Sequence, residues 1–181
     1  FPQIEIKQSS YSVPLEVLGN MVFIDYTLYN KSDEGLEDVY LAILLDLDIG
    51  YYLDNYIDKD VDRSLIFQEN VLYSGLKKLN DPEKTKMIAI NNAIDNFTEE
   101  NKMKFIIGQQ DDFETLEKED WALLVSCGPY DIPSNAFVLN SFALIGAIDK
   151  EMLIESADKA QLFHDLWSSE TEVKNASLDI E

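Results

Sequence analysis

The sequence has few of the residues on which catalytic and zinc sites depend. It contains one cysteine, Cys127, and one histidine, His164. A single cysteine forms no disulfide within the chain, and one cysteine with one histidine is a poor ligand set for zinc. Cys127 ends the apolar run 121–127, which favours a buried structural thiol over a reactive one. His164 lies beside Asp165, which favours a structural or surface histidine over a catalytic one.

Signatures of an active site are also missing. No glycine-rich phosphate loop occurs, and no spacing argues for a Cys127–His164 dyad. Asp46 and Asp48 could in principle serve as acid and base of a glycosidase, but any strongly acidic protein offers such carboxylate pairs. We therefore expect a non-catalytic chain, with a small enzyme of unrecognised type as the alternative.

Positive charge is scarce. The chain has 14 Lys and Arg against 35 Asp and Glu, a formal net charge of −21. Such a surface repels phosphates, so we expect no nucleic-acid partner and no attraction to anionic membranes. No apolar run reaches the length of a membrane span, so no membrane insertion is expected. The charge attracts cations, but a merely solvated acidic surface or a halophilic source would give the same balance.

The length of 181 residues suits one domain with a substantial core. The apolar fraction of 46% and the charged fraction of 27% are typical of a folded protein. The chain begins with Phe1 rather than Met, so we expect a piece of a longer, processed or excised parent. The scarcity of cysteine fits a cytosolic protein or an exported bacterial or archaeal one.

Alternating apolar residues predict strands in the first part of the chain. Residues 21–29 and 38–48 alternate, and the turn signal at 30–35 between them predicts an antiparallel hairpin. In the second strand one set of residues is expected to face the core: Val39, Leu41, Ile43, Leu45 and Leu47. Residues 50–63 are rich in Asp and Tyr and are predicted to form a long polar loop.

The rest of the chain adds strands and two helices. Strands are predicted at 64–67, 70–74, 86–90, 121–126 and 137–145, with a turn at 128–133. Thr98 is a predicted N-cap of a short helix that runs to about Gly108. Residues 149–167 have helical spacing, with one stripe formed by Met152, Ser156, Ala160, Phe163 and Trp167. The sequence thus predicts a mainly β, antiparallel β-sandwich domain over residues 1–167 with one short internal helix and one C-terminal helix, followed by a polar tail or linker over 168–181.

Several segments, taken in order, resemble one family of domains. Residues 23–30 (Phe-Ile-Asp-Tyr-Thr-Leu-Tyr-Asn) and 36–41 (Leu-Glu-Asp-Val-Tyr-Leu) are similar to its opening strands, and 45–50 (Leu-Asp-Leu-Asp-Ile-Gly) to its Asp-x-Asp-x-Gly segment. Residues 123–133 resemble its Gly-Pro turn, 137–146 its following strand, and 157–161 its closing helix. The family is a non-catalytic β-sandwich domain of large exported bacterial and archaeal proteins, including secreted subtilisin-like proteases and cell-surface proteins.

This resemblance covers about residues 4–167 and carries expectations of its own. It implies an extracellular or cell-surface location and a structural, stabilising or adhesive role beside the neighbouring domains of a parent chain. It implies no defined ligand. Apart from the neighbouring domains, the partner class we expect is a polysaccharide or a protein at the cell surface. In the family the segment equivalent to 45–50 precedes an Asp-rich loop, as it does here.

The acidic stretch 46–62 is the candidate metal site. Asp46 and Asp48 are two apart on a strand, so their side chains leave the same face roughly 6–7 Å apart at the backbone. Two such like charges are unfavourable unless they are solvated or share a cation, and Ca²⁺ takes six to eight oxygen ligands. The full candidate set is Asp46, Asp48, Asp54, Asp58, Asp60 and Asp62. The spacing is not that of an EF-hand, and a solvated loop remains the alternative to bound Ca²⁺.

Three tyrosines interleave with these aspartates. Tyr51, Tyr52 and Tyr56 suggest an alternative role as a carbohydrate-binding module, in which exposed aromatic rings hold sugar rings. The competing interpretation is that they seal the loop against the core.

Overall fold

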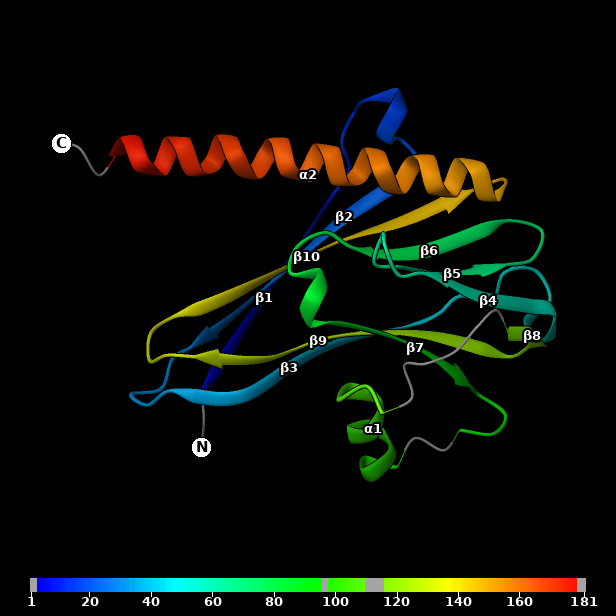
Figure 1. Ribbon diagram of the computed structural model, residues 1–181, viewed down its shortest axis with the longest axis horizontal. Coiled ribbons are helices and arrows are strands. Elements are labelled where there is room, and N and C mark those ends of the chain that lie inside the picture. Colours follow the sequence, from blue (N-terminus) through cyan, green and yellow to red (C-terminus); the bar gives the residue numbers. More distant parts are fainter. Residues whose placement is uncertain (1–2, 96–97, 110–115, 179–181) are drawn as a thin grey trace.

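The computed structural model describes residues 3–95, 98–109 and 116–178, and it stacks them in four layers (Figure 1). Helix α2 (Lys150–Leu178) covers part of a seven-stranded sheet, a three-stranded sheet packs on the opposite face, and helix α1 (Glu99–Ile106) lies outside the smaller sheet. All strand pairs are antiparallel. The prediction of a mainly β fold with a short internal helix and a C-terminal helix is therefore confirmed.

The large sheet has the strand order β1-β2-β10-β6-β5-β4-β8, and the small sheet has the order β3-β9-β7. The strands are β1 (Ile4–Tyr11), β2 (Met21–Asn30), β3 (Leu36–Asp46), β4 (Asn55–Asp60), β5 (Leu65–Glu69), β6 (Tyr73–Lys78), β7 (Thr85–Asn91), β8 (Leu116–Glu119), β9 (Trp121–Ile132) and β10 (Phe137–Ala147). Single 3-10 turns occur at η1 (Glu16–Leu18), η2 (Tyr52–Asp54) and η3 (Pro82–Lys84).

Alternation along the strands divides the apolar side chains between separate cores. Phe23, Ala143 and Ile145 lie under α2, in the core between this helix and the large sheet. Leu28 and Phe142 point the other way, into the core between the two sheets. The predicted core face of β3 packs against this second core, as expected for Val39, Leu41, Ile43, Leu45 and Leu47. A third, smaller core joins α1 to the small sheet.

The predicted hairpin between the strands at 21–29 and 38–48 is wrong. Strand β2 pairs with β1 and β10 in the large sheet, whereas β3 pairs with β9 in the small one. The segment between them crosses from one sheet to the other, and the buried Asn30 fixes this crossing. Its Nδ2 donates to the carbonyls of Glu34 at 2.7 Å and Ile132 at 2.9 Å.

The predicted loop at 50–63 is largely regular structure. It contains η2 and the whole of β4, which pairs with β5 and β8. The strand forms around Ile57, which is fully buried between the sheets. Asp58 and Asp60, which follow it in the strand, are half-buried. The two apolar residues of β4, Tyr56 and Ile57, are adjacent, so the segment shows no alternation, which is why the strand was not predicted.

The predicted turn at 128–133 is also wrong, because β9 runs through this segment to Ile132. The Gly128–Pro129 peptide bond is cis, and Gly128 has a φ of +133°. The pairing of β3 with β9 shifts register on either side of Val39, so the strand pair has a bulge here rather than a reversal. The chain turns immediately afterwards, where Ala136 N donates to the carbonyl of Pro133 at 3.1 Å.

Both predicted helices are present, with different lengths. The Thr98 hydroxyl caps α1 by accepting from Asn101 N at 3.2 Å, as predicted. Asp149 caps α2 by accepting from Met152 N at 2.7 Å. Helix α2 continues past Trp167 to Leu178, so residues 168–178 of the predicted tail are helical and 179–181 lie outside the described residues. Ser156 and Ala160 of the predicted stripe are buried, but Trp167 is exposed.

Candidate functional site

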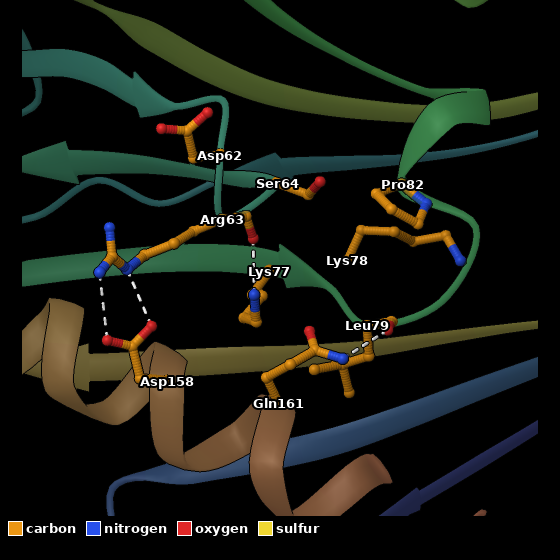
Figure 2. A pocket seen from close by; sticks show the side chains of 9 residues that line it. All are labelled: Asp62, Arg63, Ser64, Lys77, Lys78, Leu79, Pro82, Asp158 and Gln161. Carbon is orange, nitrogen blue, oxygen red and sulfur yellow. Dashed lines mark hydrogen bonds and ion pairs between the residues drawn. The ribbon is translucent and has the colours of Figure 1, made fainter.

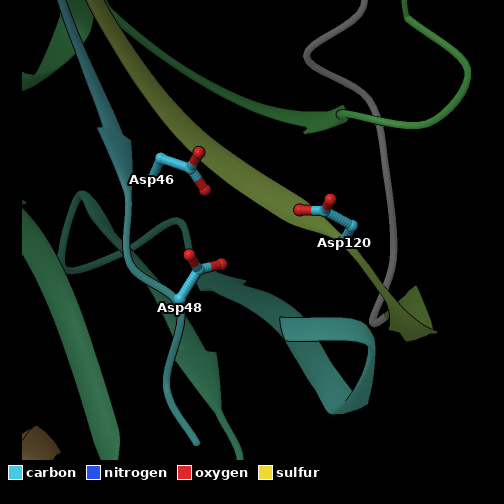
Figure 3. A group of neighbouring side chains, drawn as sticks. All are labelled: Asp46, Asp48 and Asp120. Atoms are coloured by element: carbon cyan, nitrogen blue, oxygen red, sulfur yellow. The ribbon is translucent and has the colours of Figure 1, made fainter. Parts of the chain in front are cut away.

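The candidate site lies at one end of the small sheet, where three neighbouring strands begin or end (Figure 3). Asp46 is the last residue of β3, and its partner across the ladder is Ala122 near the start of β9. Asp120 immediately precedes β9, and Asp48 follows β3 by two residues. The pairing register therefore brings residues distant in sequence to the same sheet end.

The carboxylates of Asp46, Asp48 and Asp120 offer oxygens that all lie within 4.8 Å of one another. Asp46 and Asp48 are exposed, and Asp120 is half-buried. Asn92, just after β7, links the group: its Nδ2 donates to Asp120 Oδ1 at 2.8 Å and to Asp46 Oδ1 at 3.3 Å. Its backbone N also donates to the Asp120 carbonyl at 2.8 Å. These exposed carboxylates could hold a metal ion.

The electrostatics of the group are those of crowded like charges. Partial burial raises the pKa of Asp46 above its ordinary value, and the charges of Asp48 and Asp120 raise it further. The hydrogen bond from Asn92 acts in the opposite direction, because it stabilises the ionised carboxylate. The Asn92 amide offsets only part of the repulsion between the three carboxylates. A cation bound among them would remove the rest.

The segment after Asp48 is held in place by a side chain from another element. Asn70, between β5 and β6, donates from Nδ2 to the Ile49 carbonyl at 2.7 Å. Gly50 has a φ of +70°, the left-handed conformation that glycine adopts without strain. The Asn70 side chain thus holds the backbone of the segment that follows Asp48.

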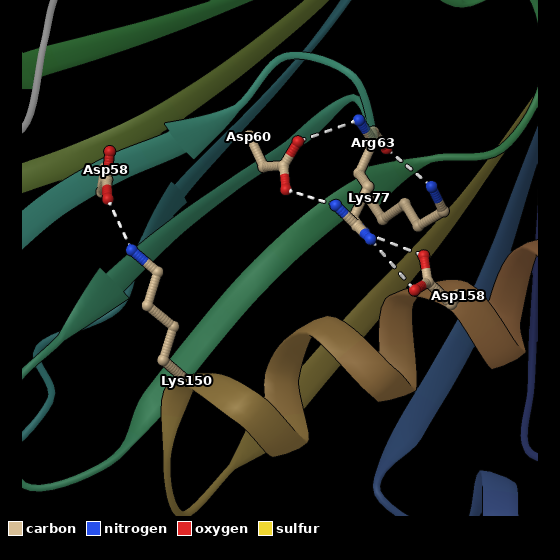
Figure 4. A network of polar contacts seen from close by, with 6 residues as sticks. All are labelled: Asp58, Asp60, Arg63, Lys77, Lys150 and Asp158. Atoms are coloured by element: carbon tan, nitrogen blue, oxygen red, sulfur yellow. Dashed lines mark hydrogen bonds and ion pairs between the residues drawn. The ribbon is translucent and has the colours of Figure 1, made fainter.

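The structure does not bring the other predicted metal ligands to this group. Asp58 and Asp60 lie along β4 and bind cations of the protein itself (Figure 4). Asp58 Oδ2 is 3.0 Å from Lys150 Nζ, and Asp60 Oδ2 is 2.9 Å from Arg63 Nη1. Arg63 Nε also contacts Asp158 Oδ1 at 2.8 Å, so these pairs tie α2 to the large sheet.

Asp54 and Asp62 lie apart from the group as well. Asp54 is in η2 and pairs with Lys118 at 3.5 Å. Asp62 follows β4 at the end opposite η2 and lines a pocket of about 300 Å³ beside α2 (Figure 2). The pocket carries charges of both signs, and Figure 2 shows Arg63 turned towards Asp158 and Lys77 bonded to the Arg63 carbonyl, so these three charged groups already have partners within the protein.

The three tyrosines are at the surface. The exposed fractions are 58% for Tyr51, 43% for Tyr52 and 36% for Tyr56. The rings of Tyr51 and Tyr52 are 5.1 Å apart at an interplanar angle of 57°, so they do not form one flat platform. Lys118 Nζ lies 5.5 Å from the centre of the Tyr56 ring. The tyrosines therefore do not seal the segment against the core.

Cys127 and His164 lie on opposite sides of the large sheet and form no dyad. Cys127 is buried between the two sheets, and burial raises the pKa of its thiol to about 11, so the thiol is protonated at neutral pH. His164 is on α2, outside the large sheet, with Nδ1 3.5 Å from Asp165 Oδ1. The inert buried thiol expected from the sequence is what the structure contains.

Sequence reasoning missed Asp120, Asn92 and Asn70. Each is a polar residue directly before or after a strand, which is ordinary for a surface loop. Their proximity to Asp46 and Asp48 follows from the order β3-β9-β7 and its register, which no pattern in the sequence reveals. Only the polar character at these strand ends could have drawn attention to them.

The fold and the site together define a two-sheet antiparallel β domain with a helix on each outer face and an acidic group at one end of the smaller sheet. Comparison of the chain with protein-family models found no match, and comparison with curated proteins found none either. Neither described helix combines the length and the apolar character needed to cross a membrane.

Proposed function

We propose that the domain is a non-catalytic accessory module of an exported multidomain protein, and that Ca²⁺ bound at Asp46, Asp48 and Asp120 stabilises it. The observation that carries the metal site is the convergence of three carboxylates within 4.8 Å from two strands and the segment that follows one of them. The exported setting is supported by the family resemblance, and the single, buried cysteine is compatible with it.

The donor set favours Ca²⁺ over transition metals. All three ligands are carboxylate oxygens, which hard cations prefer, and the exposure of Asp46 and Asp48 leaves room for water to complete the shell. Rotation of the Asn92 amide would add its Oδ1 as a fourth protein ligand, in place of the Nδ2 that now bonds the carboxylates. An exposed three-carboxylate site of this kind corresponds to the weak sites of extracellular modules, with a Kd of about 10⁻⁴–10⁻³ M.

Bound Ca²⁺ would act on the fold through the strand ends. Asp46 ends β3, Asp120 immediately precedes β9 and Asn92 follows β7, so one ion would link all three strands of the small sheet. Where Ca²⁺ is present outside the cell, such a link would stabilise the folded module, and no catalysed reaction is involved. Neighbouring domains of the parent chain, and a protein or polysaccharide at the cell surface, are the partners proposed for it.

Ca²⁺ is expected to raise the melting temperature relative to EDTA. At about 100 times Kd, binding to the folded state stabilises by about 2.7 kcal/mol, which corresponds to roughly 5–10 °C for a domain of this size. Asp46→Asn and Asp120→Asn should each abolish this rise in melting temperature. In EDTA, Asp46→Asn should melt at a higher temperature than wild type, because it removes the repulsion of Asp46 by Asp48 and Asp120. The pKa of Asp46 is raised, so the shift should shrink as the pH falls. Calorimetry at constant ionic strength measures it.

Asp62→Asn is the matched control, because Asp62 is exposed and lies at the far end of β4 from η2. This variant should keep the full Ca²⁺ response. Equal melting temperatures in EDTA and in about 10 mM Ca²⁺, with wild-type protein at neutral pH, would show that the metal site is wrong.

A second candidate function is carbohydrate binding at the tyrosine surface. It is favoured by the exposure of Tyr51 and Tyr52 next to the acidic group. If it holds, Tyr51→Ala should weaken binding to a polysaccharide at least tenfold in a glycan array followed by calorimetry, because stacked rings supply most of the contact area. Val61→Ala, at an exposed apolar position beyond the end of β4 opposite η2, is the control. Absence of binding to every polysaccharide tested rules this function out.

A further inference from the structure

Strand β1 is the outermost strand of the large sheet, and it pairs only with β2 (Figure 1). Its side chains are exposed on both faces along almost the whole strand. Two of them, Ile4 and Ile6, are large and apolar. An edge strand of eight residues presents a row of unpaired backbone groups to solvent, which makes it a template for a further strand.

The contacts with β2 show which backbone groups face outward. Lys31 N donates to the Gln3 carbonyl at 2.8 Å, and the register of the pair continues from there. Hydrogen-bonded pairs alternate in an antiparallel ladder, so Glu5, Lys7 and Ser9 bond to β2. The outward-facing N–H and C=O groups therefore belong to Ile4, Ile6, Gln8 and Ser10.

The charged side chains of β1 can pair with those of a second, antiparallel copy of β1. Glu5 and Lys7 lie on the same face, two residues apart, on either side of Ile6. If a second copy of β1 is laid antiparallel with Ile6 opposite Ile6, Glu5 of each copy faces Lys7 of the other. Ile6 then exchanges both backbone hydrogen bonds with its counterpart, and the charged residues form the close, non-hydrogen-bonded pairs.

We propose that β1 binds a second copy of this chain, edge to edge and antiparallel about a two-fold axis through Ile6, so that the two large sheets join into one. The same patch on both copies is then self-complementary, as a two-fold interface requires. The present partners of these charges are exposed side chains. Lys7 Nζ lies 3.2 Å from Glu5 Oε1 and 4.8 Å from the Tyr29 ring centre, and Lys31 Nζ lies 3.6 Å from Glu5 Oε2.

Neighbouring registers are disfavoured by charge. The hydrogen-bonding pattern allows the strands to shift only in steps that keep outward-facing residues opposite one another. The step on one side places Glu5 opposite Glu5 of the second copy, and the step on the other side places Lys7 opposite Lys7. Like charges directly across a strand pair are destabilising, so the register through Ile6 is the one selected among these three.

The net charge of the whole chain opposes the contact. Two copies each carrying −21 repel one another at long range, and salt screens this repulsion more than it screens the short Glu5–Lys7 contacts. Association should therefore be weak in dilute buffer and should strengthen as ionic strength rises towards physiological values, the reverse of an interface held mainly by opposite charges.

The test is sedimentation equilibrium of wild type and charge variants of the full chain. Lys7→Glu should reduce the association constant at least tenfold, because Glu5 then faces a glutamate, and Glu5→Lys should do the same by placing lysine opposite lysine. The double variant Glu5→Lys/Lys7→Glu has the wild-type net charge and should recover association to within about threefold of wild type. A monomer at all protein and salt concentrations overturns the proposal, as does a double variant no better than the single ones.

Cysteine cross-linking tests the register directly. Ile6→Cys places two thiols at the two-fold axis, where paired strands bring Cα atoms about 5.5 Å apart, within disulfide range. Oxidation should give a covalent dimer of this variant. Ser10→Cys, which is also exposed and has outward-facing backbone groups but lies far from the axis, is the matched control, and buried Cys127 does not compete. Equal cross-linking of the two variants contradicts this register.

Discussion

Gly128→Ala is expected to destabilise the domain by roughly 3–5 kcal/mol, from backbone strain at positive φ together with steric overlap. Gly128 has a φ of +133°, a conformation in which side chains are rarely found. A Cβ atom at this position would lie 2.7 Å from the Val39 carbonyl oxygen and 3.0 Å from Tyr40 Cδ1. Because Val39 is at the bulge between β3 and β9, relief of the overlap must move one of these strands.

Gly146→Ala provides the matched comparison for this substitution. Gly146 is an exposed strand glycine in β10, and the nearest atom to an added Cβ is the Asn20 carbonyl oxygen at 4.0 Å. Its replacement should leave stability unchanged or raise it by up to about 1 kcal/mol, through the loss of freedom in the unfolded chain. Urea unfolding of both variants measures the difference. Similar stabilities would mean that β9 is not held closely against β3 at Gly128.

Lys78→Met is expected to stabilise the domain at pH 7, although it removes a hydrogen bond. Only 1% of Lys78 is exposed, and its Nζ contacts the Asn80 side-chain oxygen and lies 5.0 Å from the Phe142 ring centre. No carboxylate among the described residues forms an ion pair with it. Burial therefore lowers the pKa of Lys78 to about 8 from 10.5. A shift of this size costs about 3 kcal/mol when the lysine is charged, so the expected gain is roughly 1–3 kcal/mol once the lost contacts are subtracted.

The pH dependence identifies the cause of this gain. Between pH 8 and pH 10.5 the unfolded chain still binds the lysine proton while the folded protein has released it. The stability contributed by wild-type Lys78 therefore rises with pH across this window, and the advantage of Lys78→Met should shrink towards zero. Cys127, whose pKa is raised to about 11, contributes in the opposite direction. The charge of Lys78 lowers the pKa of this thiol, so the comparison at pH 7, where the thiol is protonated in both proteins, isolates the effect of the lysine.

Denaturant unfolding of the two proteins at pH 7, 9 and 10 gives the difference directly. Lys150→Met is the control, since Lys150 is exposed and pairs with Asp58 at the surface. It should show no gain at pH 7 and no convergence at high pH. A Lys78→Met variant that is less stable than wild type by the same amount at every pH would mean that the buried ammonium stabilises the fold.

How far the sequence predicts this fold depends on which strand is considered. The alternation in β3 is unbroken, so its core face could be predicted residue by residue. The partners of β3 could not, because alternation fixes which face is buried and not which strand lies alongside. Adjacent strands joined by a short turn usually pair, but the buried amide of Asn30 holds a crossing between sheets instead.

The candidate site was predictable to the same limited extent. Asp46 and Asp48 could be placed together because the period of a strand puts them on one face. Asp58 and Asp60 look equivalent in the sequence, yet the burial of Ile57 draws them into a strand, where Lys150 and Arg63 bind them. Asp120 joins the group only through the register of β3 with β9, a long-range property.

The two sides of the large sheet have a consequence for how the domain unfolds. Phe142 and Ala143 are consecutive in β10, yet the first belongs to the core between the sheets and the second to the core under α2. Loss of β10 would open both cores at once, so this strand couples the core between the sheets to the core under α2. The domain should accordingly behave as one cooperative unit, in which α2 and the small sheet melt together although they lie on opposite sides of the large sheet.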